Sequence, residues 1–205
     1  MTNSGTWAVG NRLEQDNTGT APASKQGALP PRTQGRTTGV GTAAEQQRSR
    51  AVQRLGLIGS GDEERFDRLT RTAKAHFGVS SATIFLIADD QQYLKSFVGP
   101  LHRYLERNIA FCNVTIQQDE PLIIPDTLSD PRFKTNPSVV AAPFIRFYAG
   151  IPLRGPGGWF VGSFCILDQD ARDFSRNDLQ KLHALANEAE VELNTPWCHS
   201  VVATT

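Results

Sequence analysis

Residues 145–168 read IRFYAGIPLRGPGGWFVGSFCILD, and most of the expected architecture follows from this segment. Two apolar runs, 145–153 and 159–167, flank a Gly- and Pro-rich turn at 154–158. The arrangement predicts a β-hairpin, because Gly and Pro interrupt regular structure and supply the backbone conformations of tight turns. In the second run, strand alternation places Trp159, Val161 and Leu167 on one face. It places Phe160, Phe164 and Ile166 on the opposite face. A strand that is apolar on both faces indicates a sheet covered on both sides.

A second hairpin is expected earlier in the chain. The apolar run 82–88 is followed by Asp89-Asp90 and then by the run 93–98, which stops at Gly99-Pro100. A shorter strand at 122–124 ends at Pro125. Tight hairpins exclude a purely parallel sheet, so we expect the α+β class with a mainly antiparallel sheet.

Three segments have the apolar spacing of amphipathic helices, namely 42–58, 66–77 and 175–194. Ser60 and Glu63 have the three-residue spacing of a capping box before the second helix, and Gly78 follows its last apolar residue as a C-cap. Ser175, with Asp178 three residues on, is the expected N-cap of the last helix. The helices and strands together predict a domain at 42–195.

The two ends of the chain are expected to lie outside this domain. Residues 1–41 are rich in Gly, Thr, Ser, Gln, Asn and Pro, with too little apolar surface to offset the entropy of ordering. We expect a disordered tail there, or alternatively a partner-binding peptide, and a second flexible tail at 196–205. The first six residues have neither a basic start nor an apolar stretch, so a secretory signal is not expected.

Composition excludes several classes of protein. The 205 residues include 39% hydrophobic and 20% charged side chains, which suits a globular protein. Lys plus Arg and Asp plus Glu both total 21, so the net charge is zero, which argues against nucleic-acid and membrane-surface partners. The three cysteines, Cys112, Cys165 and Cys198, are odd in number and widely spaced, so we expect no disulfide framework and a reducing cytoplasmic location.

A collinear series of motifs identifies a family resemblance. The series comprises 109–116 (IAFCNVTI), 121–126 (PLIIPD), 130–133 (DPRF), Asn136-Pro137, 145–153 (IRFYAGIPL) and 162–168 (GSFCILD). In this order the motifs resemble a GAF domain of the subtype common in bacterial sensor kinases and cyclic-di-nucleotide enzymes. The resemblance covers roughly residues 45–193.

The resemblance implies a six-stranded antiparallel sheet, with terminal helices on one face and loops and short helices forming a ligand pocket on the other. It also implies a non-catalytic sensory module that binds a small molecule and signals through dimeric terminal helices. No output domain is recognised in this sequence, so we expect a stand-alone sensor that acts on a partner protein in trans. In the last helix, Leu185 and Val191 fall off the main apolar stripe and are expected at a homodimer contact.

The pocket positions implied by the resemblance give the candidate ligand-binding residues, which are Phe111, Cys112, Asp126, Arg132, Phe133, Asn136, Arg146 and Tyr148. The aromatic members are expected to form pocket walls. Arg132 and Arg146 either pair with Asp126 or Asp130 in a structural network or bind an anionic ligand. Cys112 is either a small buried side chain or a thiol that faces the ligand.

Two alternatives come from other classes. A thiol-based enzyme acting on a small oxidised metabolite, as in free methionine sulfoxide reductases of the GAF family, needs a reactive thiolate and a resolving cysteine within reach. The three cysteines fall in a pocket segment, a strand and a tail, so catalysis is not expected. The other alternative is a pocketless scaffold that only dimerises.

No cofactor or metal is expected. The four histidines, His76, His102, His183 and His199, are scattered along the chain, and no metal-binding spacing occurs. Cys198-His199 repeats a dipeptide that binds bilin in some GAF photoreceptors, but it follows the last helix and is not expected to enclose a chromophore. The protein is therefore expected to be colourless.

Overall fold

The computed structural model describes residues 43–89, 91–101, 103–107 and 111–196. Its elements, in chain order, are α1 (Ala43–Leu55), α2 (Glu64–Phe77), β1 (Ser81–Ala88), β2 (Gln91–Val98), β3 (Tyr104–Glu106), α3 (Phe111–Thr115), β4 (Leu122–Ile124), α4 (Pro137–Val140), β5 (Phe147–Arg154), the 3₁₀ turn η2 (Pro156–Gly158), β6 (Phe160–Asp168) and α5 (Arg176–Asn194). The predicted tail at 1–41 lies outside the described residues, as does all of the predicted tail at 196–205 except Pro196.

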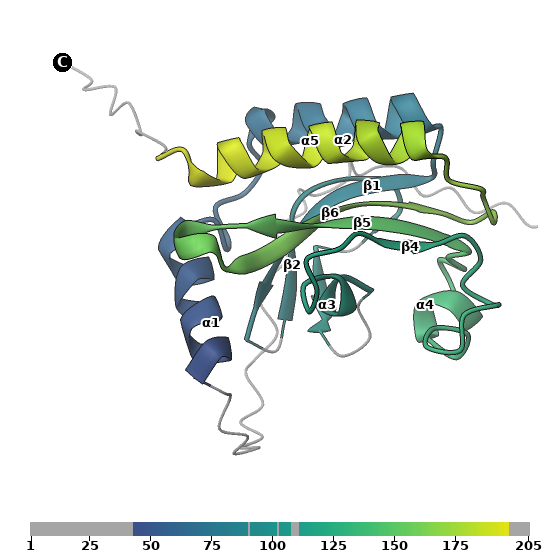
Figure 1. Cartoon of the computed structure of the whole chain (residues 1–205), viewed down its shortest axis with the longest axis horizontal. Helices are drawn as coiled ribbons and strands as arrows, with labels where there is room; N and C mark the ends of the chain where they lie inside the picture. Colours follow the sequence, from purple (N-terminus) through teal and green to yellow (C-terminus); the bar gives the residue numbers. More distant parts are fainter. Residues whose placement is uncertain (1–42, 90, 102, 108–110, 197–205) are drawn as a thin grey trace, which may run out of the picture. The chain divides into compact units, whose positions relative to one another are not determined.

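The described strands form one sheet in the order β3-β2-β1-β6-β5-β4 (Figure 1). Every pairing in it is antiparallel. The hairpin predicted in each half of the chain is present, as β1–β2 and β5–β6, and these hairpins meet where β1 pairs with β6. The expected α+β class with an antiparallel sheet is therefore confirmed.

Helices α2 and α5 lie side by side over one face of the sheet (Figure 1). Their apolar stripes are buried against this face, the first through Phe66, Leu69 and Ala73, and the second through Leu182, Ala186, Ala189 and Leu193. Burial of each large apolar side chain contributes about 1.5–3 kcal/mol. We call the apolar layer between these helices and the sheet the helix-face core.

Two of the predicted helix caps are confirmed. Gly78 ends α2 in the left-handed conformation, at φ 61°. At the start of α5 the Ser175 hydroxyl accepts a hydrogen bond from the amide of Asp178, and the Asp178 carboxylate accepts one from the amide of Ser175. These caps depend only on residues a few positions apart, which is why the sequence pattern located them.

The capping box predicted for α2 is wrong. Its N-cap is Glu63, which makes no side-chain cap hydrogen bond, and the Ser60 hydroxyl instead donates to the carbonyl of Leu57. The reason is the fully buried ammonium of Lys95, which donates to Ser60 Oγ at 2.7 Å and to the carbonyl of Gly61 at 2.7 Å and forms an ion pair with Glu63. A buried charge requires such partners, so they are not available to the helix end.

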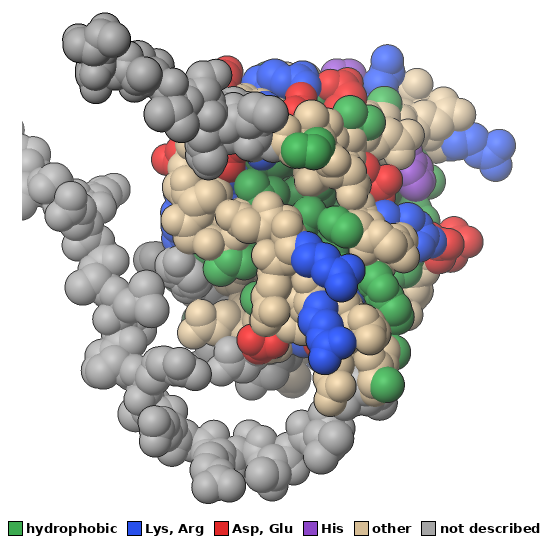
Figure 2. All heavy atoms as spheres, turned by 90° about the vertical axis from the view of Figure 1, so that its left-hand side faces the viewer, with side chains coloured by type: hydrophobic (Ala, Val, Ile, Leu, Met, Phe, Trp, Pro, Cys, Tyr) green, Lys and Arg blue, Asp and Glu red, His purple; other side chains and the backbone are tan. Residues whose placement is uncertain are grey.

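Helix α1 lies beyond the ends of β1 and β6 rather than beside α5 on the same face (Figure 1). Arg48 anchors it, since this buried side chain donates to the carbonyl of Ile87 at 2.6 Å and pairs with Glu45 at 2.8 Å. Arg50 and Arg54 of α1 are exposed. Figure 2 shows Lys and Arg side chains on the face of the molecule that lies at the left of Figure 1, the side of α1. The buried residues of α1, Ala51 and Val52, nevertheless belong to the helix-face core, so the first helix shares this core with α2 and α5 although it packs at the end of the strands.

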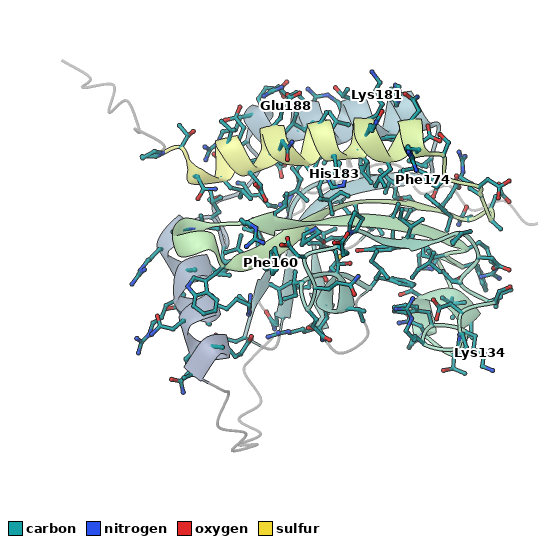
Figure 3. The ribbon with its side chains drawn as sticks, in the orientation of Figure 1. Lys134, Phe160, Phe174, Lys181, His183 and Glu188 are labelled. Atoms are coloured by element: carbon teal, nitrogen blue, oxygen red, sulfur yellow. The ribbon has the colours of Figure 1, made fainter. Side chains whose placement is uncertain are left out.

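A β-bulge changes the predicted alternation in β6. The register between β5 and β6 shifts at Leu153/Arg154, where Arg154 pairs with Phe160. As a result Val161 belongs to the helix-face core, whereas Phe160 packs on the opposite side (Figure 3). The predicted grouping of Val161 with Leu167 is wrong because strand alternation does not continue through a bulge.

Candidate functional site

The second face of the sheet is covered by α3, by α4 and by the segment that joins them to β4 and β5 (Figure 1). A separate buried cluster fills this side, and we call it the α3-face cluster. Its members are Phe85, Ile87, Leu94, Phe111, Cys112, Ile116, Leu122, Ile124, Phe133, Val139, Ile145, Tyr148, Cys165 and Leu167. It contains four of the eight predicted ligand-binding residues.

Three aromatic rings stack at the centre of this cluster. The ring of Phe111 lies 5.0 Å from that of Tyr148, at an interplanar angle of 18°, and 4.8 Å from that of Phe133, at 30°. The rings come from α3, from β5 and from the segment before α4, and all are buried. The aromatic residues expected as pocket walls are thus brought together, and they contact one another.

The hydroxyl of Tyr148 reaches α3. It donates to Cys112 Sγ at 3.4 Å, and it shares a hydrogen bond of 2.7 Å with the Thr115 hydroxyl, which is the donor when the single phenol hydrogen points at the sulfur. The ring reaches this position by lying along its own strand over Gly150, where a Cβ atom would come within 2.3 Å of the Tyr148 hydroxyl. Gly150 therefore makes room for the ring.

Cys112 and Cys165 are in contact, with their Sγ atoms 3.6 Å apart. Both thiols are free and buried, at 2% and 0% exposure. The strand register explains this contact. Cys165 pairs with Gly150 in the β5–β6 ladder, and the ring of Tyr148, whose hydroxyl contacts α3, lies over Gly150. The two cysteines expected in different elements, a pocket segment and a strand, are thus brought into contact.

The Ser163 hydroxyl completes this polar cluster. It is fully buried on the same face of β6 as Cys165, and among the described residues it has no conventional hydrogen-bond partner. A buried hydroxyl without a partner costs free energy, so its presence under α3 indicates a position that can accept a further polar contact.

The two thiols have very different proton affinities. Burial raises the pKa of Cys112. Hydrogen bonding by Cys165 and Tyr148 lowers it, as does the nearby Ser163 hydroxyl, and together they outweigh burial, so the pKa of Cys112 lies below its ordinary value. Burial and the neighbouring Cys112 raise the pKa of Cys165 far above its ordinary value. Two negative charges cannot both form at this distance in a buried site, so at most one of the two thiols can ionise, and the lower pKa is that of Cys112.

Asp126 and Arg132 serve the fold of the segment between β4 and α4. The Asp126 carboxylate accepts hydrogen bonds from the amide of Leu128 at 3.0 Å and from the hydroxyl of Ser129 at 2.8 Å, and so caps that turn. Arg132 forms an ion pair with Asp130 at 2.6 Å, and its side chain is half exposed. For these two residues the structural interpretation is supported.

Asn136 and Arg146 hold α4. Asn136 is the N-cap, and its side chain accepts a hydrogen bond from the amide of Ser138 at 2.9 Å. Among the described residues, the hydrogen bonds of the Arg146 guanidinium go to the carbonyls of Val139 at 2.8 Å and Ile145 at 3.1 Å. The expected ion pair of Arg146 with a carboxylate is therefore replaced by contacts with the end of α4.

Sequence reasoning missed Thr115, Ser163 and the functional position of Cys165. A signal existed for the first, because Thr115 follows Phe111 and Cys112 within one helical turn. For the other two, alternation in β6 shows that Ser163 and Cys165 share a face, but not that this face lies under α3.

A hollow of about 240 Å³ lies on the helix side of the sheet, where α2 ends and α5 begins. Phe77 and Phe174 line it, and Figure 3 shows Phe174 between α5 and the sheet. Arg172, also in its lining, donates to the carbonyls of Phe77 and Gly78 and pairs with Asp168. Its charge is thus used by the fold, and the α3-face cluster is the better candidate site.

Two absences hold within the described part of the chain. None of the helices there has the length and apolar character needed to cross a membrane. His, Cys, Asp and Glu side chains of the same residues form no group of three or more suited to a metal ion.

Comparison with known proteins gives a family match and one curated relative. The family model described as GAF domain matches residues 61–193. The relative, a cyclic di-GMP phosphodiesterase of Pseudomonas aeruginosa, is 31% identical over 152 residues, which are 74% of this chain and 26% of the relative. The chain therefore spans about a quarter of the length of that protein.

Solved structures share the fold at low sequence identity. The free methionine-R-sulfoxide reductase of Neisseria meningitidis, solved with its substrate, is 17% identical with a TM-score of 0.54, over 73% of this chain and 89% of that one. The GAF domain of an Acinetobacter phosphoenolpyruvate-protein phosphotransferase is 15% identical with a TM-score of 0.51, over 72% and 92% of the two chains.

Proposed function

This chain belongs to the GAF family, and we propose that it is a non-catalytic sensory or regulatory module that binds a small molecule under α3. The observation that supports this proposal best is the composition of the α3-face cluster. Stacked aromatic rings adjoin a small set of buried polar groups, which is the composition typical of small-molecule sites. Tyr148 belongs to both parts, through its ring and its hydroxyl.

Ligand entry requires α3 to move, because the rings fill the space beneath it. This helix has only five residues, and it is held by the stack and by the hydrogen bonds of Thr115 and Cys112 with Tyr148. A ligand that takes over these contacts would shift α3 relative to β5 and β6. A change in packing of this kind is how a binding event reaches the rest of a domain.

The signal is proposed to leave through a homodimer formed by the terminal helices, toward a partner protein in the cytoplasm. Val191 on α5 is 67% exposed, which suits a contact with a second copy. Leu185, the other residue expected at this contact, packs against the helix-face core and is not available. The dimer proposal therefore depends on the outer side of α5 around Val191.

The named activity of the curated relative does not lead us to propose phosphodiesterase activity for this chain. The match covers 26% of that protein. The family model matches this chain over residues 61–193 as a GAF domain. We propose that this part supplies regulation.

The contact between Cys112 and Cys165 favours one second candidate, a thiol enzyme that reduces a small oxidised metabolite. Such an enzyme needs a nucleophilic thiolate with a resolving thiol in reach, and the 3.6 Å separation provides that pair. Burial of both thiols argues against it as the primary function, since a substrate must touch the attacking sulfur.

Isothermal titration of the full chain with cyclic AMP, cyclic GMP and methionine sulfoxide tests the proposal. We expect one of them to bind, and Tyr148→Leu to weaken that binding at least tenfold. Val140→Leu, at an exposed residue of α4, is the matched control and should bind as wild type does. Steady reduction of methionine sulfoxide with dithiothreitol, abolished by Cys112→Ser, would establish the enzyme instead.

A further inference from the structure

We propose that Cys112 and Cys165 are a redox pair, which a hydroperoxide oxidises to an intramolecular disulfide between α3 and β6 and which a dithiol reductant restores. This inference goes beyond the proposed function and does not depend on ligand binding. It assigns a reversible modification site to two thiols that are otherwise simply buried.

The geometry supports bond formation between these two sulfur atoms. They approach to 3.6 Å although Cys112 and Cys165 are 53 positions apart in the sequence. A disulfide requires about 2.05 Å, so the sulfurs must close by about 1.5 Å, which rotation of the side chains and a small shift of α3 can supply. The short α3 helix is the element that can adjust, whereas Cys165 lies in β6 between two paired strands.

The surroundings assign different roles to the two thiols. Cys112 is the attacking group, because Tyr148 donates a hydrogen bond to its sulfur and the Ser163 hydroxyl lies nearby. Cys165 keeps its proton, since burial and the neighbouring thiolate oppose a second charge. The pair thus has one nucleophile and one resolving thiol, as stepwise thiol oxidation requires.

The chemistry balances in two steps. The Cys112 thiolate attacks one oxygen of hydrogen peroxide, so that an S–O bond forms, the O–O bond breaks and the released hydroxide takes up a proton to give water. Cys165 then attacks the sulfur of the resulting sulfenic acid, forming the S–S bond and releasing a second water that carries away the thiol proton. Two electrons pass from the thiols to the peroxide, and a dithiol returns them by exchange.

Burial defines which oxidants can act. Both thiols are almost inaccessible, so the small hydrogen peroxide molecule is expected to oxidise the folded protein, whereas a bulky aromatic disulfide reagent reaches the pair only after unfolding. The new bond would fix α3 to β6 and hold the α3-face cluster closed.

Peptide mapping of the full chain tests the proposal. Reduced protein is treated with hydrogen peroxide, quenched in acid, alkylated under denaturing conditions and digested without reduction. We expect a peptide that joins Cys112 to Cys165, together with a mass loss of two hydrogen atoms that dithiothreitol reverses. Cys198→Ser should form the same disulfide at the same rate, and Tyr148→Phe should form it several times more slowly.

Single thiol variants and unfolded protein serve as controls. In Cys165→Ala, peroxide should leave Cys112 as a sulfenic acid that dimedone traps, while wild type in urea should give mixed pairings that include Cys198. Folded wild type that gives only sulfinic acid, no cross-link, or cross-links through Cys198 would overturn the proposal. The wild-type map decides the question even if a thiol variant does not fold.

Discussion

The ring of Tyr148 lies over Gly150, two residues further along the same strand. Because Gly150 has no side chain, the ring can lie flat along β5 and place its hydroxyl next to Thr115 and Cys112. Gly150 also pairs with Cys165 on β6, so one glycine brings the tyrosine, the helix and the second thiol into a single cluster.

Gly150→Ala should therefore destabilise the protein by about 1–3 kcal/mol, the usual cost of an overpacked core. The added Cβ would lie 2.3 Å from the Tyr148 hydroxyl and 2.7 Å from the ring carbon that bears it, so the ring must leave the stack. Urea unfolding measures the change. Tyr148→Leu removes the clash, so the double variant should cost less than the sum of the single variants, and strict additivity would show that the two residues do not interact.

The buried ion pair of Lys95 with Glu63 gives a second prediction. Lys95 has no exposed surface, so Glu63→Gln leaves a buried ammonium without its carboxylate and should cost about 3 kcal/mol in urea unfolding. Lys95→Met in the same chain should recover part of this loss. The control is Glu188→Gln on the exposed outer side of α5 (Figure 3), for which we expect no more than about 0.5 kcal/mol. Equal losses at the two glutamates would contradict the interpretation.

Stability should fall in acid partly because of Glu45. Hydrogen bonding by Arg48 lowers the pKa of Glu45, and burial raises it. The hydrogen bond from Arg107 lowers the pKa further, so that it falls from 4.5 to about 2. The carboxylate then stabilises the fold fully above pH 4.5, and this contribution is lost as the pH falls from 4.5 to about 2. With the side chain partly exposed, we expect roughly 1–2 kcal/mol.

Unfolding free energies at pH 5.5 and pH 3 measure this effect. Glu45→Gln should narrow the difference between the two values, because the variant side chain does not titrate, while Glu188→Gln should leave the difference close to that of wild type. An unchanged difference in Glu45→Gln would show that the Arg48 and Arg107 contacts do not stabilise the charged form.

The proposed dimer contact is tested at Val191. Val191→Glu places a charge at an exposed position of α5, so it should split the dimer without lowering the stability of each subunit. Val140→Glu is the matched control, since Val140 is 58% exposed on α4, on the other side of the sheet (Figure 1). Light scattering should give a dimer for wild type and for the control. A monomeric wild type, or a dimeric Val191→Glu, would refute the contact.

Features that depend on neighbouring residues could be predicted from the sequence. The hairpins, the Gly78 C-cap and the Ser175 capping box were located because turn residues and caps act over a few positions. The aromatic part of the site, Phe111, Phe133 and Tyr148, came from the family resemblance, and the structure brings these rings together.

Features that depend on strand register or on distant partners could not be predicted. The bulge at Leu153/Arg154 moves Val161 to the other face, and Gly162 in β6 signals an irregularity there without showing at which residue the register shifts. The contact between Cys112 and Cys165 requires both the β5–β6 register and the position of α3. The capping box predicted for α2 does not form because the buried ammonium of Lys95 binds both Ser60 and Glu63. The three-residue spacing of Ser60 and Glu63 carries no information about this distant partner.

Native mass spectrometry of the full chain as purified, with an absorbance scan, tests the central proposal of a ligand-binding regulatory module most directly. We predict a colourless dimer that carries a small molecule, released on denaturation and absent from Tyr148→Leu but retained by Val140→Leu. A monomer, or a bare dimer that also binds none of cyclic AMP, cyclic GMP and methionine sulfoxide, would contradict the account.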